Sequence, residues 1–425
     1  MTDRGASRFL LLNSKEIVHR LPQWFPDARD ELVVVTTREA LDASPLPDPA
    51  SHFRHLQVME DFDDPRTEHE LADLCRRFGV ERVLSTGERG VLRAARLRHR
   101  FGLPGQDLAT ATAFRDKFVM KSRLAEAGIE VAPMRLVDSA AELRDFAAEV
   151  GFPVVVKPLD RGGSAGLRVL DGPVELAEFL RDWDPGRPRA PRLAEAWIDG
   201  DFYQVNGLMA EGRIVFGQPC LNPYSDWFSV QFDAPGMSAM LPGGHPLTDR
   251  LHANAARVLA ALPPVPGVCA FQTEFFHTPD DRLVLCEAAC RAGGSAMVDT
   301  HEAVYGVNLH GASLLGQAGR GTARTDYPPL GPLQGYARFP PARGVLRAIP
   351  GECPLPGALS YTASGEVGRR YQGARSLGPS IALLTFTLSG PDVRAELREV
   401  EEWWERNTHW EDRTNALSRA RQLNS

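Results

Sequence analysis

The sequence predicts a protein of mixed α/β and α+β class, with an N-terminal parallel α/β domain, a central core of antiparallel sheets and a small C-terminal subdomain that contains β-strands. Over the first hundred residues, short apolar runs alternate with helical stretches, which is typical of a parallel sheet covered by helices. From Leu193 to Gln218, three apolar strands follow one another, which favours antiparallel pairing, and a helix at 249–262 is expected before the next strands. Beyond about residue 325, glycines and prolines separate short strands before a helical tail that begins near Asp392.

Length and composition limit the classes of function. A chain of 425 residues is too long for one hydrophobic core, so two or three domains are expected. The net charge of −7 argues against a protein that binds duplex nucleic acid or a membrane surface. The longest early apolar run, Phe9 to Leu12, is too short for a signal peptide or a membrane span. The six cysteines show no metal or disulfide spacing, so we expect packed, reduced thiols in a cytoplasmic protein, Cys286 and Cys290 included.

Four units are expected along the chain, and they cover residues 1–109, 110–190, 191–324 and 325–425. In the first unit, no GxGxxG follows the first strand, which argues against dinucleotide binding. The second unit should open with one long helix from Thr110 to Gly128 and close with a Pro/Arg-rich connector at 184–192. The strands expected in these two units cover residues 8–13, 31–37, 55–60, 81–86, 134–137, 153–157 and 167–170. The helices expected there, apart from the long one, cover 67–79 and 87–101 and follow a cap at Asp138 or Ser139.

The segment from Phe271 to Gly294 carries the strongest functional signal. Two apolar strands flank a Pro-Asp-Asp turn, and each strand contains one glutamate. If the loop has two residues, centred between Asp280 and Asp281, paired positions sum to 561 and Glu274 lies opposite Glu287. Like charges in that position destabilise a hairpin unless a cation lies between them, and a divalent metal is the simplest candidate. Arg291 follows with Gly293 and Gly294, adding a cation that can bind an anion and a close backbone approach.

Three other features suggest an anion or nucleotide site, and each has a simpler interpretation. Lys157 precedes the glycine-rich DRGGSAG loop at 160–166, which can fold over phosphates or be only a turn. Lys117 lies on a helix, where a lysine usually faces solvent. Glu195 lies on a strand, where it can accept a hydrogen bond from an adenine amino group or be an exposed edge residue.

Taken in order, these motifs resemble the ATP-grasp superfamily of carboxylate–amine ligases, in the style of the bacterial L-amino-acid ligase branch. The similar segments are RDKFVMKSRLAEAGIEVAP, FPVVVKPLDRGGSAGLRVL, EAWIDG, the 271–294 hairpin and YGVNL at 305–309. The resemblance covers residues 110–315 and implies a two-lobed ATP-grasp core behind an N-terminal domain. It implies ATP contacts at Lys117, Lys157, Gly162, Gly163, Ser164, Gly166, Glu195 and Ile198, metal ligands at Glu274 and Glu287, and a catalytic role for Arg291 with Lys157.

The sequence departs from the family pattern at three places. Ala289 stands where the family often has an asparagine that binds the second metal ion. Phe202 aligns with the acidic residue that usually binds the ribose, and Asp201 is the candidate substitute. Gln272 stands where relatives often have histidine.

The resemblance implies that ATP and one or two Mg²⁺ ions, or Mn²⁺, activate a carboxylate as an acyl phosphate, which an amine converts to an amide. We expect small amino-acid or amine substrates near Arg291, Gly293 and Gly294, with Asp233, His245 and His301 as polar candidates in the acceptor pocket. Bicarbonate activation, amino-acid loading onto a carrier protein and a non-catalytic nucleotide-binding scaffold are the alternatives. The sequence leaves the two substrates and the oligomeric state open, with a homodimer among the options.

Overall fold

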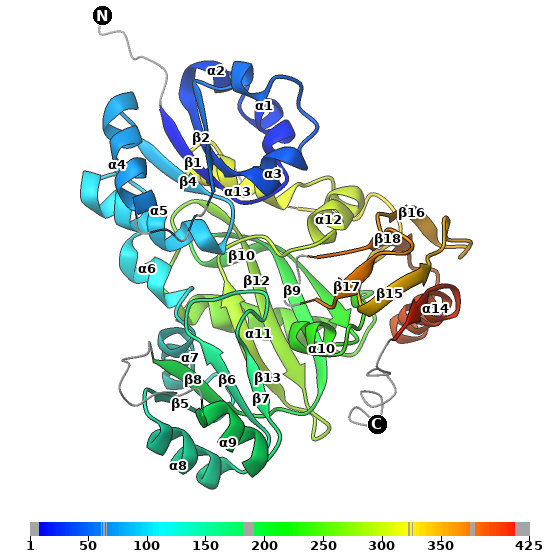
Figure 1. Ribbon diagram of the computed structural model, residues 1–425. Helices are drawn as coiled ribbons and strands as arrows, with labels where there is room; N and C mark the ends of the chain where they lie inside the picture. Colours follow the sequence, from blue (N-terminus) through cyan, green and yellow to red (C-terminus); the bar gives the residue numbers. More distant parts are fainter. Residues whose placement is uncertain are drawn as a thin grey trace, which may run out of the picture.

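The structure, a computed structural model, describes residues 8–60, 62, 64, 66–181, 191–321, 324, 326–374 and 379–412. Their strands form four sheets, and helices pack beside these sheets (Figure 1). Most of the connector expected at 184–192 lies outside the described residues, and only Pro191 and Arg192 belong to them.

The N-terminal domain is a parallel sheet with strand order β3-β2-β1-β4, as predicted. Every residue of the central strand β1 is buried, because helices cover both faces of the sheet, and its sequence is accordingly an unbroken apolar run up to Asn13. The strands are β1 (Phe9–Asn13), β2 (Leu32–Thr37), β3 (His55–Met59) and β4 (Arg82–Ser85). The helices are α1 (Leu21–Trp24), α2 (Ala28–Glu31), α3 (Arg38–Asp42), α4 (Arg66–Phe78) and α5 (Glu88–Phe101), with short 3-10 turns at Val18–Arg20 and Pro49–His52.

The single long helix expected from Thr110 to Gly128 is wrong, because the chain forms two helices there, α6 (Leu108–Ala113) and α7 (Lys117–Glu126). Asp116 starts α7 by accepting hydrogen bonds from the backbone N–H groups of Phe118 and Val119 at 2.9 and 3.0 Å. The cap makes Lys117 the first residue of α7. The predicted helix end is confirmed, since Gly128 follows α7 with a φ of 71°.

The small lobe is an antiparallel sheet with strand order β5-β8-β6-β7, packed against α8 (Ala140–Val150) and α9 (Pro173–Arg181). Ser139, one of the two predicted caps, starts α8 through a capping box with Glu142. The glycine-rich loop connects the neighbouring antiparallel strands β6 and β7. The strands are β5 (Met134–Val137), β6 (Val154–Pro158), β7 (Arg168–Leu170) and β8 (Arg192–Ala196).

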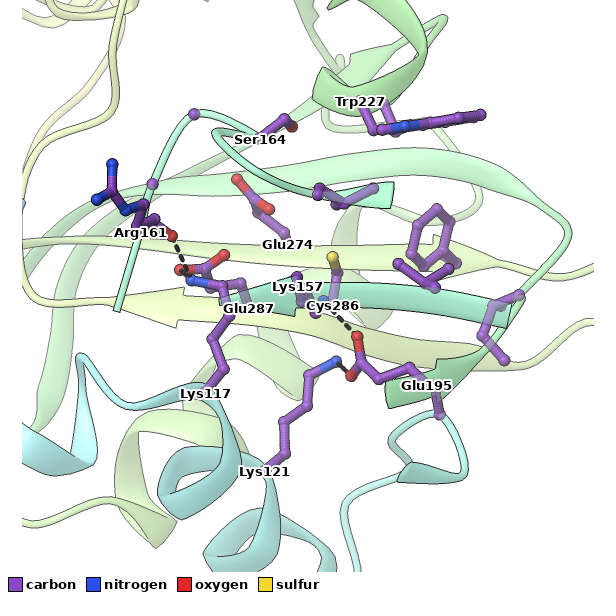
Figure 2. A pocket seen from close by; sticks show the side chains of 18 of the residues that line it. Lys117, Lys121, Lys157, Arg161, Ser164, Glu195, Trp227, Glu274, Cys286 and Glu287 are labelled. Carbon is purple, nitrogen blue, oxygen red and sulfur yellow. Dashed lines mark hydrogen bonds and ion pairs between the residues drawn. The ribbon is translucent and has the colours of Figure 1, made fainter. Parts of the chain in front are cut away.

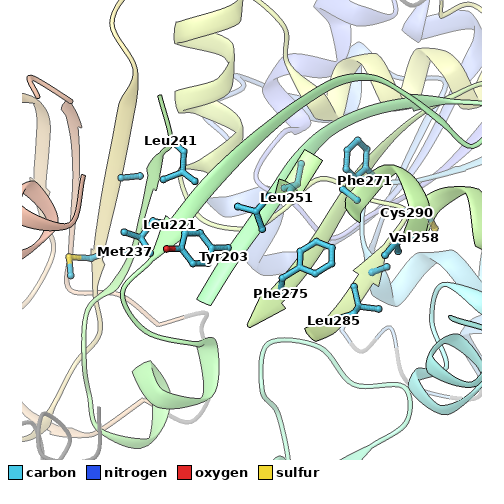
Figure 3. Close-up of a cluster of buried hydrophobic side chains, with 14 of the residues drawn as sticks. Tyr203, Leu221, Met237, Leu241, Leu251, Val258, Phe271, Phe275, Leu285 and Cys290 are labelled. Carbon is cyan, nitrogen blue, oxygen red and sulfur yellow. The ribbon is translucent and has the colours of Figure 1, made fainter. Parts of the chain in front are cut away.

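The large lobe is built on an eight-stranded sheet with order β13-β12-β9-β10-β11-β14-β18-β16. One face packs on α11 (Thr248–Ala261) through a core that includes Tyr203, Leu251 and Phe271 (Figure 3). The strands from this part of the chain are β9 (Asp201–Ala210), β10 (Arg213–Asn222), β11 (Gly236–Met240), β12 (Val268–His277) and β13 (Leu283–Ala289). The remaining helices here are α10 (Asp226–Gln231), α12 (Met297–Tyr305) and α13 (Leu309–Gln317).

The C-terminal region extends the large sheet and adds a small one. Three of its strands continue the eight-stranded sheet, while β17, β15 and β19 form a separate three-stranded sheet. The predicted helical tail is confirmed as α14 (Val393–Asn407), capped by Asp392, with Trp404 stacked on Phe339 at a ring distance of 3.9 Å. The strands are β14 (Gln334–Phe339), β15 (Arg343–Ala348), β16 (Ala358–Ala363), β17 (Arg370–Gln372), β18 (Ala382–Thr387) and β19 (His409–Glu411). Among the described residues, no helix is both long and apolar enough to cross a membrane.

Close packing of α13 on β12 depends on Gly316, because a Cβ there would overlap the backbone carbonyl of Val268. Alanine normally favours a helix over glycine by about 1 kcal/mol. We nevertheless expect Gly316→Ala to lower the free energy of unfolding by about 1–3 kcal/mol, since backbone atoms must separate. Urea titration would measure this, with Gly351→Ala as the control, where a Cβ meets nothing within 4 Å. Unchanged stability of Gly316→Ala would contradict this packing.

Candidate nucleotide and metal site

The hairpin formed by β12 and β13 places Glu274 directly opposite Glu287, which confirms the predicted pair. The predicted two-residue loop is wrong. The N–H of Thr278 donates to the carbonyl of Arg282 at 3.0 Å, which leaves a three-residue loop ending at Asp281 with a φ of 64°. Between the loop and Cys286, the two strands therefore pair one position away from the predicted register. A β-bulge at Cys286 then restores the expected register before Glu287.

A cleft lies between the two lobes and brings together ten of the predicted site residues, several of which are labelled in Figure 2. The lid loop and β6 form one wall, and the Glu274–Glu287 hairpin forms the other. The predicted residues that line the cleft are Lys117, Lys157, Gly162, Gly163, Ser164, Glu195, Ile198, Glu274, Glu287 and Arg291. The sequence motifs therefore converge on one space although they span 175 positions, from Lys117 to Arg291.

Lys117 links the lid to the acidic hairpin. Its ammonium lies 3.0 Å from Glu287 Oε1 and donates to the carbonyl of Arg161 at 2.9 Å. The side chain is only 6% exposed, so the simpler interpretation of a solvated helical lysine is wrong. Its ammonium is therefore placed where a phosphate between the lid and the carboxylates would meet it.

Glu195 is held between two lysines. Lys121 pairs with Oε1 of its carboxylate and Lys157 with Oε2, and all three side chains are at most 9% exposed. Glu195 lies on β8, between β5 and β6, so it is not the exposed edge residue of the simpler interpretation. Burial alone would raise the pKa of this carboxyl, but the two lysines outweigh it and lower the pKa to about 2. Glu195 is therefore ionised at neutral pH.

Arg291 is oriented by a carboxylate from the N-terminal domain. Its Nε and Nη2 atoms lie 3.0 and 2.5 Å from Oε1 of Glu88, and Nη1 bonds to the side chain of Gln272. Burial raises the pKa of Glu88, but Arg291, Arg115 and Lys117 together lower it to about 2. The lid also reaches this point, since a Cβ on Gly162 would overlap the Glu88 carboxylate. Three separate parts of the chain thus meet at Arg291.

One end of the cleft is an apolar slot lined by aromatic and aliphatic side chains. Trp197 and Trp227 meet edge to face with ring centroids 5.6 Å apart, and Ile198, Phe202 and Phe276 complete the lining. Phe202 thus contributes an aromatic surface at the position where the sequence resemblance implies an acidic residue. Strand alternation turns Asp201 away, and its carboxylate bonds Arg394 at 2.7 Å. The structure therefore does not bring Asp201 to the cleft as a ribose ligand.

The other predicted residues lie beside the cleft or away from it. Gly166 ends the lid with a φ of 78°, and Gly293 lies against Asn206 and Gln272, two positions after Arg291. Asp233 accepts hydrogen bonds from the backbone of Arg343 and Ala374, and His245 Nδ1 accepts from Leu247. His301 is buried in α12, where loss of solvation lowers its pKa to about 4. These three residues, like Gly166, Gly293 and Gly294, are outside the cleft lining.

The cleft also contains functional residues that sequence reasoning missed. Lys121 has the clearest signal, because it follows Lys117 by one helical turn and so shares its face of α7. Glu88 follows a strand of the parallel sheet at its carboxyl edge, a recurrent position for site residues. Trp227 comes from α10, a helix with no counterpart among the expected elements, and Cys286 is turned into the cleft by the bulge. Burial raises the pKa of the Cys286 thiol to about 12, so it is protonated, and all six cysteines are free thiols as expected.

The residues present suit a metal ion that is shared with a phosphate chain. Glu274 and Glu287 present two carboxylates across one hairpin rung, and hard oxygen ligands are those that Mg²⁺ prefers. No cluster of three or more potential His, Cys, Asp or Glu ligands occurs within the described ranges. Mg²⁺ is commonly held by one or two carboxylates plus substrate phosphates, which fits this pair. The other coordinating oxygens would therefore come from ATP and water.

Comparisons with known proteins agree with this geometry. Residues 116–183 match the family described as carbamoyl-phosphate synthase L chain, ATP binding domain. The chain is 23% identical over 304 residues to the L-arginine-specific L-amino acid ligase of Bacillus subtilis, covering 70% of this chain and 72% of that one. It is 24% identical over 282 residues to the alanine–anticapsin ligase of Bacillus subtilis, covering 59% and 57%. The chain spans between 38% and 72% of the length of three curated relatives that it matches.

The fold extends the similarity over nearly the whole chain. The crystal structure of the L-amino acid ligase from Bacillus licheniformis superposes with a TM-score of 0.71 at 15% identity, covering 96% of this chain and 100% of that one. The chain thus has the fold of that L-amino acid ligase, and its residues 116–183 match an ATP-binding domain that the sequence motifs also predict. Among ATP-grasp proteins, the chain is similar to L-amino acid ligases.

Proposed function

We propose that this protein is an ATP-dependent carboxylate–amine ligase that joins an amino acid, through its carboxylate, to an amine and releases ADP and phosphate. The observation that carries the proposal is the rung formed by Glu274 and Glu287, which faces the glycine-rich lid, Lys117 and Lys157 across one cleft. A carboxylate pair opposite phosphate-binding lysines suits a metal–nucleotide complex.

The charge of the cleft also fits a polyanion. Lys117, Lys121, Lys157, Arg161 and Arg291 outnumber the four carboxylates that line it, although the whole chain carries a net charge of −7. The apolar slot at Trp197 and Ile198 would take the adenine ring, and Glu195 would accept from its amino group. The lid glycines Gly162 and Gly163, with Ser164, would cover the phosphates. Glu274 and Glu287 would hold Mg²⁺, or Mn²⁺, and the bound ion would supply charge neutralisation for the phosphates.

The reaction follows from this arrangement. An oxygen of the substrate carboxylate attacks the γ-phosphorus of ATP, the bond to the ADP oxygen breaks, and an acyl phosphate forms. Lys157 and Arg291 stabilise the negative charge on the transferring phosphoryl group. The amine then attacks the acyl carbon, inorganic phosphate leaves, and the nitrogen loses a proton to give the amide. Gly162 packed against Glu88 closes the lid over the site, which protects the acyl phosphate from water.

The relatives named as L-amino acid ligases favour amino acids as substrates, and the reacting carboxylate would lie at Arg291 beside Gly293 and Gly294. We assign no substrate contact to Asp233 or His245, because their acceptor atoms already bond to backbone groups. His301 is likewise given none, since it is buried within its own helix.

The proposal is tested by a phosphate-release screen with ATP, Mg²⁺ and amino acids supplied in pairs. We expect ADP and phosphate to form with particular pairs, together with a product whose mass equals the sum of the two amino acids minus water. Added hydroxylamine should trap the acyl phosphate as a hydroxamate. ATP turnover driven by bicarbonate alone would contradict amide synthesis, and ATP binding without ADP release for any pair would indicate a scaffold.

A further inference from the structure

Lys121 has no assigned role, yet it is the most deeply buried cation of the cleft, with a side chain 2% exposed. We propose that Lys121 is a positioning residue that keeps the Glu195 carboxylate charged and in place, so that Lys157 is free to leave Glu195 for the phosphates of ATP. The inference rests on the proposed ATP binding and assigns different roles to Lys121, which stays on Glu195, and Lys157, which binds phosphate.

The geometry shows one carboxylate shared by two ammonium groups. Lys121 pairs with one oxygen of Glu195 and Lys157 with the other (Figure 2). The two pairs come from different elements, α7 and β6. A single carboxylate neutralises only one ammonium, so the trio with both lysines protonated carries one surplus positive charge, and burial lowers the pKa of Lys121. Burying an unbalanced charge is costly, which makes the surplus ammonium the group that an incoming anion attracts.

The positions of the two lysines indicate which ammonium would leave Glu195 for an incoming anion. Lys157 lies at the end of β6, where the chain enters the lid, and it feels the charge of Glu287 on the metal hairpin. Lys121 lies a helical turn behind Lys117, and its charged neighbours are Glu195 and Lys157. Phosphates bound between lid and hairpin would therefore draw Lys157 and leave Lys121 on Glu195.

Loss of Lys121 should make the protein take up a proton when ATP binds, which the native protein does not do. The groups that face Glu195 are Lys121 from α7, Lys157 from β6 and the protonated Cys286 from β13. Once Lys157 turns to the nucleotide, Lys121 is the remaining counter-ion. Without Lys121, burial raises the pKa of the Glu195 carboxyl, and full burial can shift a carboxyl by 3–5 units. Glu195 would then bind a proton whenever ATP binds near neutral pH.

Calorimetric titration of the full chain with MgATP, in buffers of different ionisation enthalpy, measures this proton directly. Relative to the wild type, we expect Lys121→Met to take up about one additional proton per ATP between pH 7 and 8. Its ATP affinity should fall by up to about tenfold per pH unit in this range, again relative to the wild type. A purely structural role for Lys121 would lower stability or affinity without changing the number of protons.

Three variants make the test specific. Lys121→Arg keeps the charge and should bind ATP without the additional proton. The double variant Lys121→Met with Glu195→Gln has no carboxyl to protonate, so the additional proton should disappear. Lys121→Gln replaces Lys121→Met if the latter does not fold, and carries the same expectation. The inference is overturned if folded Lys121→Met or Lys121→Gln takes up the same number of protons per ATP as the wild type. A wild type that binds no ATP would instead overturn the proposed function itself.

Discussion

Glu287→Gln should abolish ADP formation while the protein remains folded. The substitution removes one carboxylate from the rung with Glu274, so the proposed metal loses a charged ligand. Loss of such a clamp should cost several kcal/mol of transition-state stabilisation, or a fall in kcat of roughly 10²–10⁴-fold. Lys117 keeps its second partner, the carbonyl of Arg161, so α7 and the lid stay connected. A coupled assay of ADP release, with circular dichroism to confirm folding, measures the effect.

The control for this substitution is Asp281→Asn, which makes the same chemical change in the same hairpin. Asp281 lies exposed in the loop, where it bonds Arg250, and asparagine tolerates its left-handed backbone. We expect kcat within about twofold of the wild type, since surface ion pairs contribute little. Unchanged turnover in Glu287→Gln would remove the metal assignment from the hairpin.

Arg291→Met should lower ADP formation by roughly 10²–10³-fold, the usual cost of losing one group that stabilises transition-state charge. The guanidinium now makes two bonds to Glu88 and one to Gln272, which aim it at the cleft. ATP affinity should change by less than about threefold, because the proposed role concerns the transferring phosphoryl and the substrate carboxylate. Single-turnover kinetics and equilibrium ATP binding separate these two effects.

The same substitution leaves Glu88 with a weaker set of partners, because Arg115 lies 3.4 Å away and becomes its nearest cation. The double variant Arg291→Met with Glu88→Gln removes this carboxylate, which has lost its nearer cation, and should recover stability without recovering turnover. Arg291→Lys keeps the positive charge but loses the planar guanidinium group, and we expect its turnover to remain well below that of the wild type. Recovery of turnover in the double variant would show that the loss in Arg291→Met came from instability.

The sequence predicted those parts of the site that are encoded locally. The lysine before the glycine-rich loop, the capped lysine of α7 and the two glutamates each lie in a short motif whose spacing sets their relation. The parallel order of the first domain followed from its alternating pattern in the same way. The simpler interpretations of Lys117 and Glu195 were wrong, because isolated residue types do not reveal that several elements bury them together.

The parts that sequence reasoning missed depend on contacts between distant segments. Glu88 reaches Arg291 across 203 positions, and no local pattern marks that meeting. Trp227 depends on where α10 packs, and Asp201 was misplaced because one step along a strand reverses the direction of a side chain. The break between α6 and α7 was missed because a helical pattern obscured Asp116 as a cap.

The hairpin of β12 and β13 contains a three-residue loop and a β-bulge that compensates for it. Its loop is one residue longer than a tight turn, and the bulge at Cys286 shifts the strand by one position in the compensating direction. Homologous hairpins that are aligned outward from the loop would therefore misassign the carboxylates, whereas alignment inward from Arg291 would not. The opposition of Glu274 and Glu287 therefore depends on the three-residue loop and the bulge at Cys286 together.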